Sequence, residues 1–187
     1  MVSTPTPVCD FGTRAIDFNL PGVDGKNHSL ISAAGPNGLL VMFICNHCPY
    51  VKSALPRIIR DTRELATLGI GAIAIMSNDP QEYLDDNWDN MKTLACNLDL
   101  PFPYVLDETQ EVARAYGAVC TPDFFGYNRN LELQYRGRLD AHHGKHTVDK
   151  STRRELFEAM KQVALQDCGP REQFPSIGCS IKWREEK

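Results

Sequence analysis

Two cysteines separated by two residues follow directly after an apolar run, and this feature constrains the chain more than any other. Residues 39–44 are all apolar, which predicts a strand buried on both faces of a sheet. Cys45 and Cys48 come next, and beyond them the spacing of apolar residues becomes that of a helix. A CxxC at such a junction is typical of a redox-active dithiol when the protein carries no sign of secretion. The rest of the chain is therefore expected to be the scaffold for these two thiols.

The length and charge of the chain limit the classes of protein to which it can belong. With 187 residues it is expected to form one domain, residues 1–187, with a core at about 15–167 and an irregular C-terminal tail at 168–187. A net charge of -4 argues against a nucleic-acid partner, and no apolar run has the length of a membrane span. Residues 1–11 lack a basic region followed by an apolar one, so we expect a cytoplasmic location and no membrane partner.

The cysteine count points to thiols rather than to a disulfide framework. Seven cysteines are many for this length, but too few for a fold held together by disulfides. Because the number is odd, the cysteines cannot all pair within the chain. In a reducing compartment most are expected to be thiols, with the closely spaced pair used for catalysis or metal binding.

Strand and helix patterns alternate along the chain after a short N-terminal β-hairpin. That hairpin is expected at residues 15–30, with a turn at Gly25 and Lys26, behind a loosely held segment at residues 1–14. The expected strands lie at residues 39–44, 70–76, 103–106, 122–127 and 131–136. The expected helices begin after Cys48 and at Asn78-Asp79-Pro80, and lie at residues 109–116 and 153–165. This order predicts an α/β fold with a central mixed sheet, mainly parallel with an antiparallel edge, flanked by helices.

The spacing of the two cysteines suits disulfide exchange. If Cys45 lies at the N-terminal edge of the helix, unpaired backbone N–H groups and the helix dipole favour its thiolate, which is the nucleophilic form. Attack by Cys45 on a substrate disulfide would give a mixed disulfide, which Cys48 then resolves. His47 lies between them, and a cationic imidazole there would lower the pKa of the attacking thiol further and make the couple more oxidising.

A structural disulfide, a zinc half-site or two unreactive thiols are the other interpretations of the same pair. Zinc needs two further ligands at matching spacing, and the sequence contains no second CxxC. We therefore expect a redox pair, with no bound metal and no cofactor.

Thr121-Pro122 is the second notable feature, because it follows a helix and opens the last predicted hairpin. Most X-Pro bonds are trans, and the residues alone predict trans here. However, the order of CxxC helix, strand, helix, Thr-Pro, hairpin and helix resembles the thioredoxin-like superfamily. The resemblance implies that Pro122 is cis and packs against the CxxC, and that Thr121 offers backbone hydrogen bonds to a bound substrate.

Four segments are similar to the redoxin branch of that superfamily, the alkyl hydroperoxide reductase/thiol-specific antioxidant family, and to a bacterial subgroup with the motif CNHCPYVK. The resemblance covers about residues 15–185 and rests on residues 15–26, 45–52, 107–111 and 178–183. It implies a thiol–disulfide oxidoreductase with a role in antioxidant defence and redox homeostasis. The substrate would be a protein or small-molecule disulfide, and electrons would come from a partner dithiol protein.

The sequence departs from the related enzymes at positions that matter for the reaction. Thioredoxin has a buried acid in the strand before the motif, and residues 39–44 contain none. Peroxiredoxins have Thr-x-x-Cys-Pro, which places Cys48 at the peroxide-attacking position but puts Cys45 where the threonine should be. The arginine that such enzymes require would have to be Arg136 or Arg138. A thiol peroxidase acting through Cys48 is therefore the first alternative function.

A copper carrier is the second alternative function. Copper-binding relatives with this fold use two cysteines, spaced one residue further apart, and a distant histidine, and Cys with His suits copper. Here the ligands would be Cys45, Cys48 and a histidine from His142, His143 or His146.

Two other cysteines are candidate accessory thiols. Cys120 precedes Thr121-Pro122 and is expected near the active site, either as a third redox thiol or as a small packed residue. Cys179 lies in the tail that is expected to pack on the core, where it is a candidate resolving thiol.

Overall fold

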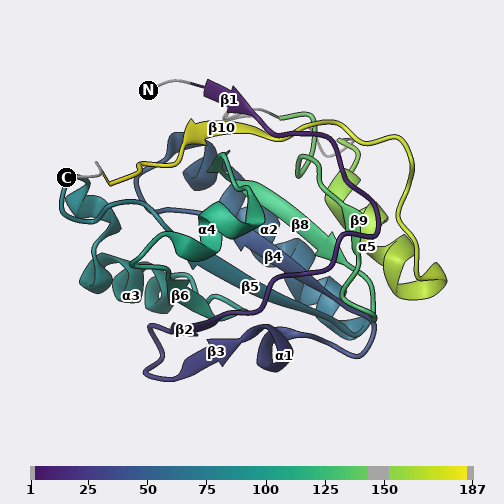
Figure 1. Cartoon of the computed structure of the whole chain (residues 1–187), viewed down its shortest axis with the longest axis horizontal. Helices are drawn as coiled ribbons and strands as arrows, with labels where there is room; N and C mark the ends of the chain where they lie inside the picture. Colours follow the sequence, from purple (N-terminus) through teal and green to yellow (C-terminus); the bar gives the residue numbers. More distant parts are fainter. Residues whose placement is uncertain (1–2, 143–151, 185–187) are drawn as a thin grey trace.

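A five-stranded mixed sheet forms the centre of the computed structural model, which describes residues 3–142 and 152–184 (Figure 1). The strand order is β6 (Tyr104–Leu106), β5 (Ile70–Met76), β4 (Gly38–Phe43), β8 (Asp123–Tyr127) and β9 (Leu133–Tyr135). Strand β4 pairs in parallel with β5 and antiparallel with β8, so it lies in the middle of the sheet. The predicted α/β fold with a central mixed sheet is confirmed.

Both faces of the sheet are covered by helices, which explains why β4 is apolar throughout. Leu40 and Met42 face one layer of the core, and Leu39, Val41 and Phe43 face the other, as the two-residue period of a strand requires. The first layer contains α2 (Pro49–Thr67), α3 (Trp88–Asn97) and α5 (Glu155–Gln166). The second contains α1 (Leu30–Ala33) and α4 (Glu111–Tyr116).

The expected N-terminal hairpin is present and lies beside the edge of the sheet. It consists of β2 (Asn19–Pro21) and β3 (Asn27–Ser29), paired antiparallel. Gly25 has a φ of 83°, a backbone conformation that residues other than glycine rarely adopt. An isolated bridge between Gly22 and Val105 attaches the hairpin to β6.

Two segments near the ends of the described residues, 3–5 and 177–180, are more ordered than the sequence indicated. Residues 1–14 were expected to be loosely held and residues 168–187 irregular, but β1 (Ser3–Pro5) and β10 (Ile177–Ser180) are strands. They form a second sheet of order β1, β10, β7, in which β7 (Cys120–Thr121) is the short segment before Pro122. Figure 1 shows β1 and the yellow β10 side by side along one side of the domain.

The helix predicted to begin at Asn78-Asp79-Pro80 begins only at Trp88, where the Asn87 side chain accepts a hydrogen bond from the Asn90 amide at 2.9 Å. The intervening segment contains only the short helix η1 (Leu84–Asp86). The backbone of this segment bonds to the C-terminal tail, since the Asp79 amide donates to the Lys182 carbonyl at 2.9 Å. The segment therefore attaches to the C-terminal tail instead of continuing the helix.

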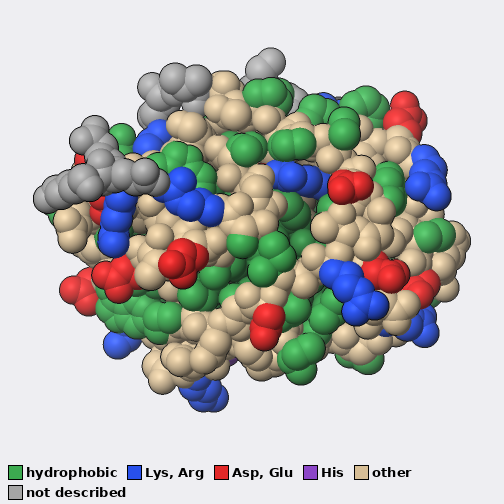
Figure 2. All heavy atoms as spheres, viewed as in Figure 1, with side chains coloured by type: hydrophobic (Ala, Val, Ile, Leu, Met, Phe, Trp, Pro, Cys, Tyr) green, Lys and Arg blue, Asp and Glu red, His purple; other side chains and the backbone are tan. Residues whose placement is uncertain are grey.

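The surface carries charges of both signs. Acidic and basic side chains lie intermixed over the face seen in Figure 2, with apolar side chains between them. Within residues 3–142 and 152–184, no helix is both long and apolar enough to cross a membrane.

Candidate active site

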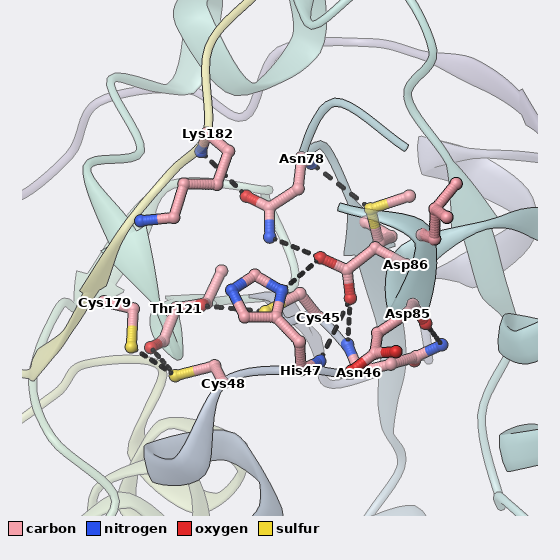
Figure 3. Close-up of polar contacts among 12 residues, drawn as sticks. Cys45, Asn46, His47, Cys48, Asn78, Asp85, Asp86, Thr121, Cys179 and Lys182 are labelled. Carbon is pink, nitrogen blue, oxygen red and sulfur yellow. Dashed lines mark hydrogen bonds and ion pairs between the residues drawn. The ribbon is translucent and has the colours of Figure 1, made fainter. Parts of the chain in front are cut away.

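Cys48, not Cys45, occupies the N-terminal boundary of helix α2. The helix begins at Pro49, which suits proline because the first helical residues need no amide partner, and Cys48 is its N-cap. Its side chain is completely buried. The sulfur lies 3.1 Å from the carbonyl oxygen of Thr121 and 3.0 Å from the sulfur of Cys179 (Figure 3).

The surroundings of Cys48 favour its thiolate. The thiol of Cys45 donates a hydrogen bond to the Cys48 sulfur and so lowers the pKa of Cys48, against the effect of burial. The Cys179 thiol and the backbone N–H groups of Val51 and Cys179 lower the pKa of Cys48 further, to about 4.

Cys45 has the opposite character. It is 1% exposed, and its sulfur lies 3.2 Å from the hydroxyl oxygen of Thr121. Burial raises the pKa of Cys45 well above its usual range, and the hydrogen bond to Cys48 and the carboxylate of Asp86 raise it further. The expectation that Cys45 lies at the helix edge with a lowered pKa is therefore wrong, because the helix begins three residues later than that position requires.

His47 belongs to a buried network centred on Asp86 from η1. The Asp86 carboxylate accepts hydrogen bonds from His47 Nδ1 at 2.5 Å, from the His47 amide at 3.1 Å and from the Asn46 amide at 2.7 Å. Asn78 Nδ2 donates to the same carboxylate at 2.8 Å. The imidazole also stacks on Tyr83, with 5.0 Å between ring centroids. The residues between the two cysteines are thus held in place through their backbone amides as well as through the His47 side chain.

The Thr121-Pro122 peptide bond is cis, as the family resemblance implied and the residues alone did not. Thr121 contacts the sulfurs of both cysteines: its carbonyl oxygen lies against Cys48 and its hydroxyl against Cys45. Its backbone edge pairs with β10, where Thr121 lies opposite Cys179.

The two candidate accessory thiols differ in position. Cys179 contacts Cys48, whereas the sulfur of Cys120 lies 3.6 Å from the carbonyl oxygen of Pro122. Burial raises the pKa of both thiols, that of Cys179 to about 12. The structure thus places Cys179 in contact with Cys48, whereas Cys120 packs against the backbone of Pro122.

The two arginines considered for a peroxidase site are engaged elsewhere. Arg136 Nη2 lies 2.7 Å from the carbonyl oxygen of Gly117 and 3.1 Å from the Asp123 carboxylate. Arg138 forms an ion pair with Glu155 at 2.8 Å. Among the contacts that the structure gives for the described residues, neither guanidinium reaches Cys48.

Ligand atoms that could hold a metal ion come together at Cys45, His47 and Asp86, all within 4.8 Å of one another. However, both oxygens of Asp86 already accept hydrogen bonds. Of the histidines considered for copper, His142 is bonded through Nε2 to the hydroxyl of Thr152 at 2.5 Å. His143 and His146 lie outside the described residues.

Asp86 and Asn78 are the site residues that the sequence did not reveal. Asn78 fits the sequence pattern of a helix cap, but it lies two residues after β5, at the same edge of the sheet as Cys45, which lies two residues after β4. Polar residues at the carboxyl ends of neighbouring parallel strands meet at one edge, and that placement was the available signal.

The lowered pKa of Cys48 leads to a direct test. The ultraviolet absorbance of one thiolate is expected in the reduced protein at neutral pH, and to disappear as the pH falls through about 4. Because a lowered pKa means that the folded protein keeps the thiolate, the signal is retained above that pH and lost below it. Cys48→Ser should remove it and exposed Cys96→Ser should not. A signal that appears only near pH 9 would contradict the assignment.

Comparison with known proteins shows a family to which this sequence is similar. The sequence model of the AhpC/TSA family matches residues 11–141. A solved structure described as an uncharacterized conserved protein from Geobacillus kaustophilus is 38% identical, with a TM-score of 0.94 and coverage of 100% of this chain and 99% of that one. A hypothetical protein from Sinorhizobium meliloti is 35% identical, with a TM-score of 0.92 and coverage of 98% and 100%.

More distant structures share the fold. One is a thiol:disulfide interchange protein of the thioredoxin family from Chlorobium tepidum, 18% identical, with a TM-score of 0.61 and coverage of 82% of this chain and 97% of that one. A comparison with curated proteins gives no match. The match over residues 11–141, together with the thioredoxin-like fold and the CxxC at its expected junction, shows that the chain belongs to the AhpC/TSA family.

Proposed function

We propose that this protein is a thiol–disulfide oxidoreductase that uses the Cys45–Cys48 dithiol. Membership of the AhpC/TSA family supports a thiol-based redox function. The observation that carries the finer proposal is the contact of both sulfurs with Thr121, the residue before the cis Pro122, with Cys48 at the N-cap of α2.

The environments of the two thiols support an order of attack in which Cys48 is the nucleophile. Cys48, whose pKa is lowered, attacks one sulfur of a substrate disulfide and forms a mixed disulfide, while the other substrate sulfur leaves as a thiolate and takes up a proton. Cys45 then attacks the Cys48 sulfur, its proton leaves with the second substrate thiol, and a Cys45–Cys48 disulfide remains. A partner dithiol protein restores both thiols with two electrons. This order reverses the one expected from the sequence.

Single substitutions test this order. With a chromogenic aryl disulfide, Cys45→Ser should still release the first equivalent of aryl thiolate rapidly, because Cys48 is intact. Cys48→Ser should lose that rapid release, because burial holds the remaining Cys45 as a thiol. Exposed Cys96→Ser serves as the control for a cysteine outside the site.

The opposite pattern, rapid release by Cys48→Ser and none by Cys45→Ser, would make Cys45 the nucleophile. Equal slow release by both variants would reject a catalytic dithiol.

A second candidate function is peroxide reduction by Cys48. It is favoured by the lowered pKa at a Cys-Pro helix start, but Arg136 and Arg138 are paired with carboxylates. Hydrogen peroxide should then yield a sulfenic acid at Cys48 in the Cys45→Ser protein, detected with a sulfenic-acid-specific reagent. Slow formation, comparable to that at exposed Cys96, would reject this candidate.

A further inference from the structure

The C-terminal strand β10 lies where the proposed function would place a substrate. Cys179 pairs with Thr121 and Ser180 with Cys120, in antiparallel register along β7. The pairing continues as the Ile181 amide donates to the Val119 carbonyl at 3.2 Å. An extended peptide docking on this edge would use the same backbone groups.

Within this strand, Cys179 holds the position of a substrate sulfur. Its Sγ lies 3.0 Å from Cys48 Sγ, although the two residues are 131 positions apart in the sequence (Figure 3). Cys48 lies between the two other thiols, since its sulfur forms hydrogen bonds with the sulfurs of both Cys45 and Cys179. Three buried sulfurs thus form one contact chain with Cys48 in the middle.

The strand that carries Cys179 fits closely and is anchored on both sides. Gly178 lies so close to β7 that a Cβ there would come within 2.1 Å of the Thr121 carbonyl oxygen. Before it, the Ser176 hydroxyl donates to the Pro122 carbonyl at 2.7 Å. After it, the Lys182 amide donates to Asn78 Oδ1 at 2.9 Å, and Gln110 Nε2 donates to the Lys182 carbonyl at 2.8 Å. The position of Cys179 is therefore fixed by contacts of its strand with three separate segments of the chain, at Thr121-Pro122, Asn78 and Gln110.

We propose that Cys179 is a third catalytic thiol, which forms a disulfide with Cys48 during the reaction. The proposal rests on the proposed function, since it needs an oxidised Cys48. In the Cys45–Cys48 disulfide, the Cys179 sulfur attacks Cys48, a Cys48–Cys179 bond forms, the Cys45–Cys48 bond breaks, and the Cys179 proton passes to the departing Cys45 sulfur. No electrons are gained or lost, because one disulfide replaces another.

The same attack can resolve a mixed disulfide between Cys48 and a substrate. The Cys179 sulfur bonds to Cys48, and the substrate sulfur leaves with the proton. The oxidised protein thus has two internal disulfides that share Cys48, and the one with Cys179 leaves Cys45 as a thiol.

Removing Cys45 isolates this step. Reduced Cys45→Ser protein is treated with oxidised glutathione, quenched with an alkylating reagent and mapped as peptides without reduction. The Cys48 peptide should be linked to the Cys179 peptide, with glutathione on Cys48 only transient. In Cys45→Ser/Cys179→Ser, glutathione should remain on Cys48, and in Cys45→Ser/Cys120→Ser the link to Cys179 should form as before.

The outcomes separate the two proposals. Glutathione that remains on Cys48 equally long with and without Cys179 would overturn the role of Cys179 and leave exchange at Cys48 intact. No glutathione on Cys48 in any variant would overturn both. Oxidised protein with all seven cysteines gives a second measurement that needs no substitution, because a linked Cys48–Cys179 peptide is expected beside the Cys45–Cys48 one.

Discussion

Asp86→Ala is expected to lower the free energy of unfolding by about 3–5 kcal/mol, the usual cost of removing one partner from a buried charged network. The carboxylate is completely buried and accepts hydrogen bonds from the amides of Asn46 and His47 and from the side chains of His47 and Asn78. Alanine leaves these donors buried without an acceptor, and each loses a bond to a charged group. For a chain of this size, the midpoint of thermal unfolding should fall by about 6–20 °C.

Two neighbouring substitutions identify the cause of that loss. Asp85→Ala removes an exposed carboxylate from the same short helix and should change the unfolding midpoint little. Asp86→Asn keeps an oxygen for the Asn46 and His47 amides and removes the charge that raises the pKa of Cys45. It should therefore cost less stability than alanine while lowering the pKa of Cys45. Equal unfolding midpoints for Asp85→Ala and Asp86→Ala would contradict the central role of Asp86.

Gly178→Ala is expected to expose the buried sulfurs. The added Cβ would meet backbone atoms, with the Thr121 carbonyl oxygen at 2.1 Å and its carbonyl carbon at 2.6 Å, and backbone cannot move aside as a flexible side chain can. Overpacking of this kind costs about 1–3 kcal/mol, and the cost falls on the state in which β10 is docked. The population with β10 undocked should then rise about 5- to 150-fold, since 1.4 kcal/mol is a factor of ten.

The rate of Cys48 alkylation by iodoacetamide in the reduced protein measures this opening. It should rise by the same factor, because Cys48 is completely buried and β10 lies against its sulfur. Ser180→Ala, on the same strand and without an added atom, should leave the rate unchanged. An unchanged rate in Gly178→Ala would show that reagents reach Cys48 by another route.

The features that could be predicted from the sequence depend on neighbouring residues. The central strand was evident because a strand with helices on both sides must be apolar at every position, as residues 39–44 are. The hairpin before it was evident from alternation around Gly25, and the stop of α4 from Gly117, whose φ is 62°. The cis state of Pro122 came only from the family resemblance.

The features that were missed depend on contacts between distant segments. Asp86 reaches Asn46 across 40 positions, and no periodicity links the two. Asn78 satisfies the local pattern of a helix cap, but its side chain bonds to Asp86 and to the tail. The tail has little apolar content to mark it as a strand, and β10 forms because β7 and β1 offer their backbone edges on either side.

The pKa of Cys48 is lowered first by its hydrogen bond with Cys45 and in part by its place at the start of a helix. A shift of three residues along the chain moves the N-cap from Cys45 to Cys48, and with it the backbone N–H groups that favour a thiolate. Helix boundaries are the part of a sequence-based prediction with the largest error. Chemistry that depends on one helical turn therefore required the structure.

The pairing of β1 with β10 has a consequence for the newly made protein. Ser3 lies opposite Cys179, so this sheet joins residues from nearly opposite ends of the chain. Because a ribosome releases the N-terminal part first, β4 and α2 can fold while residues 177–180 are still being made. Until these last residues emerge, Cys48 lacks the strand that buries it. The nascent chain therefore passes through an interval in which the Cys48 thiol, whose pKa is lowered in the folded protein, is not covered by β10, and this interval ends when β10 docks.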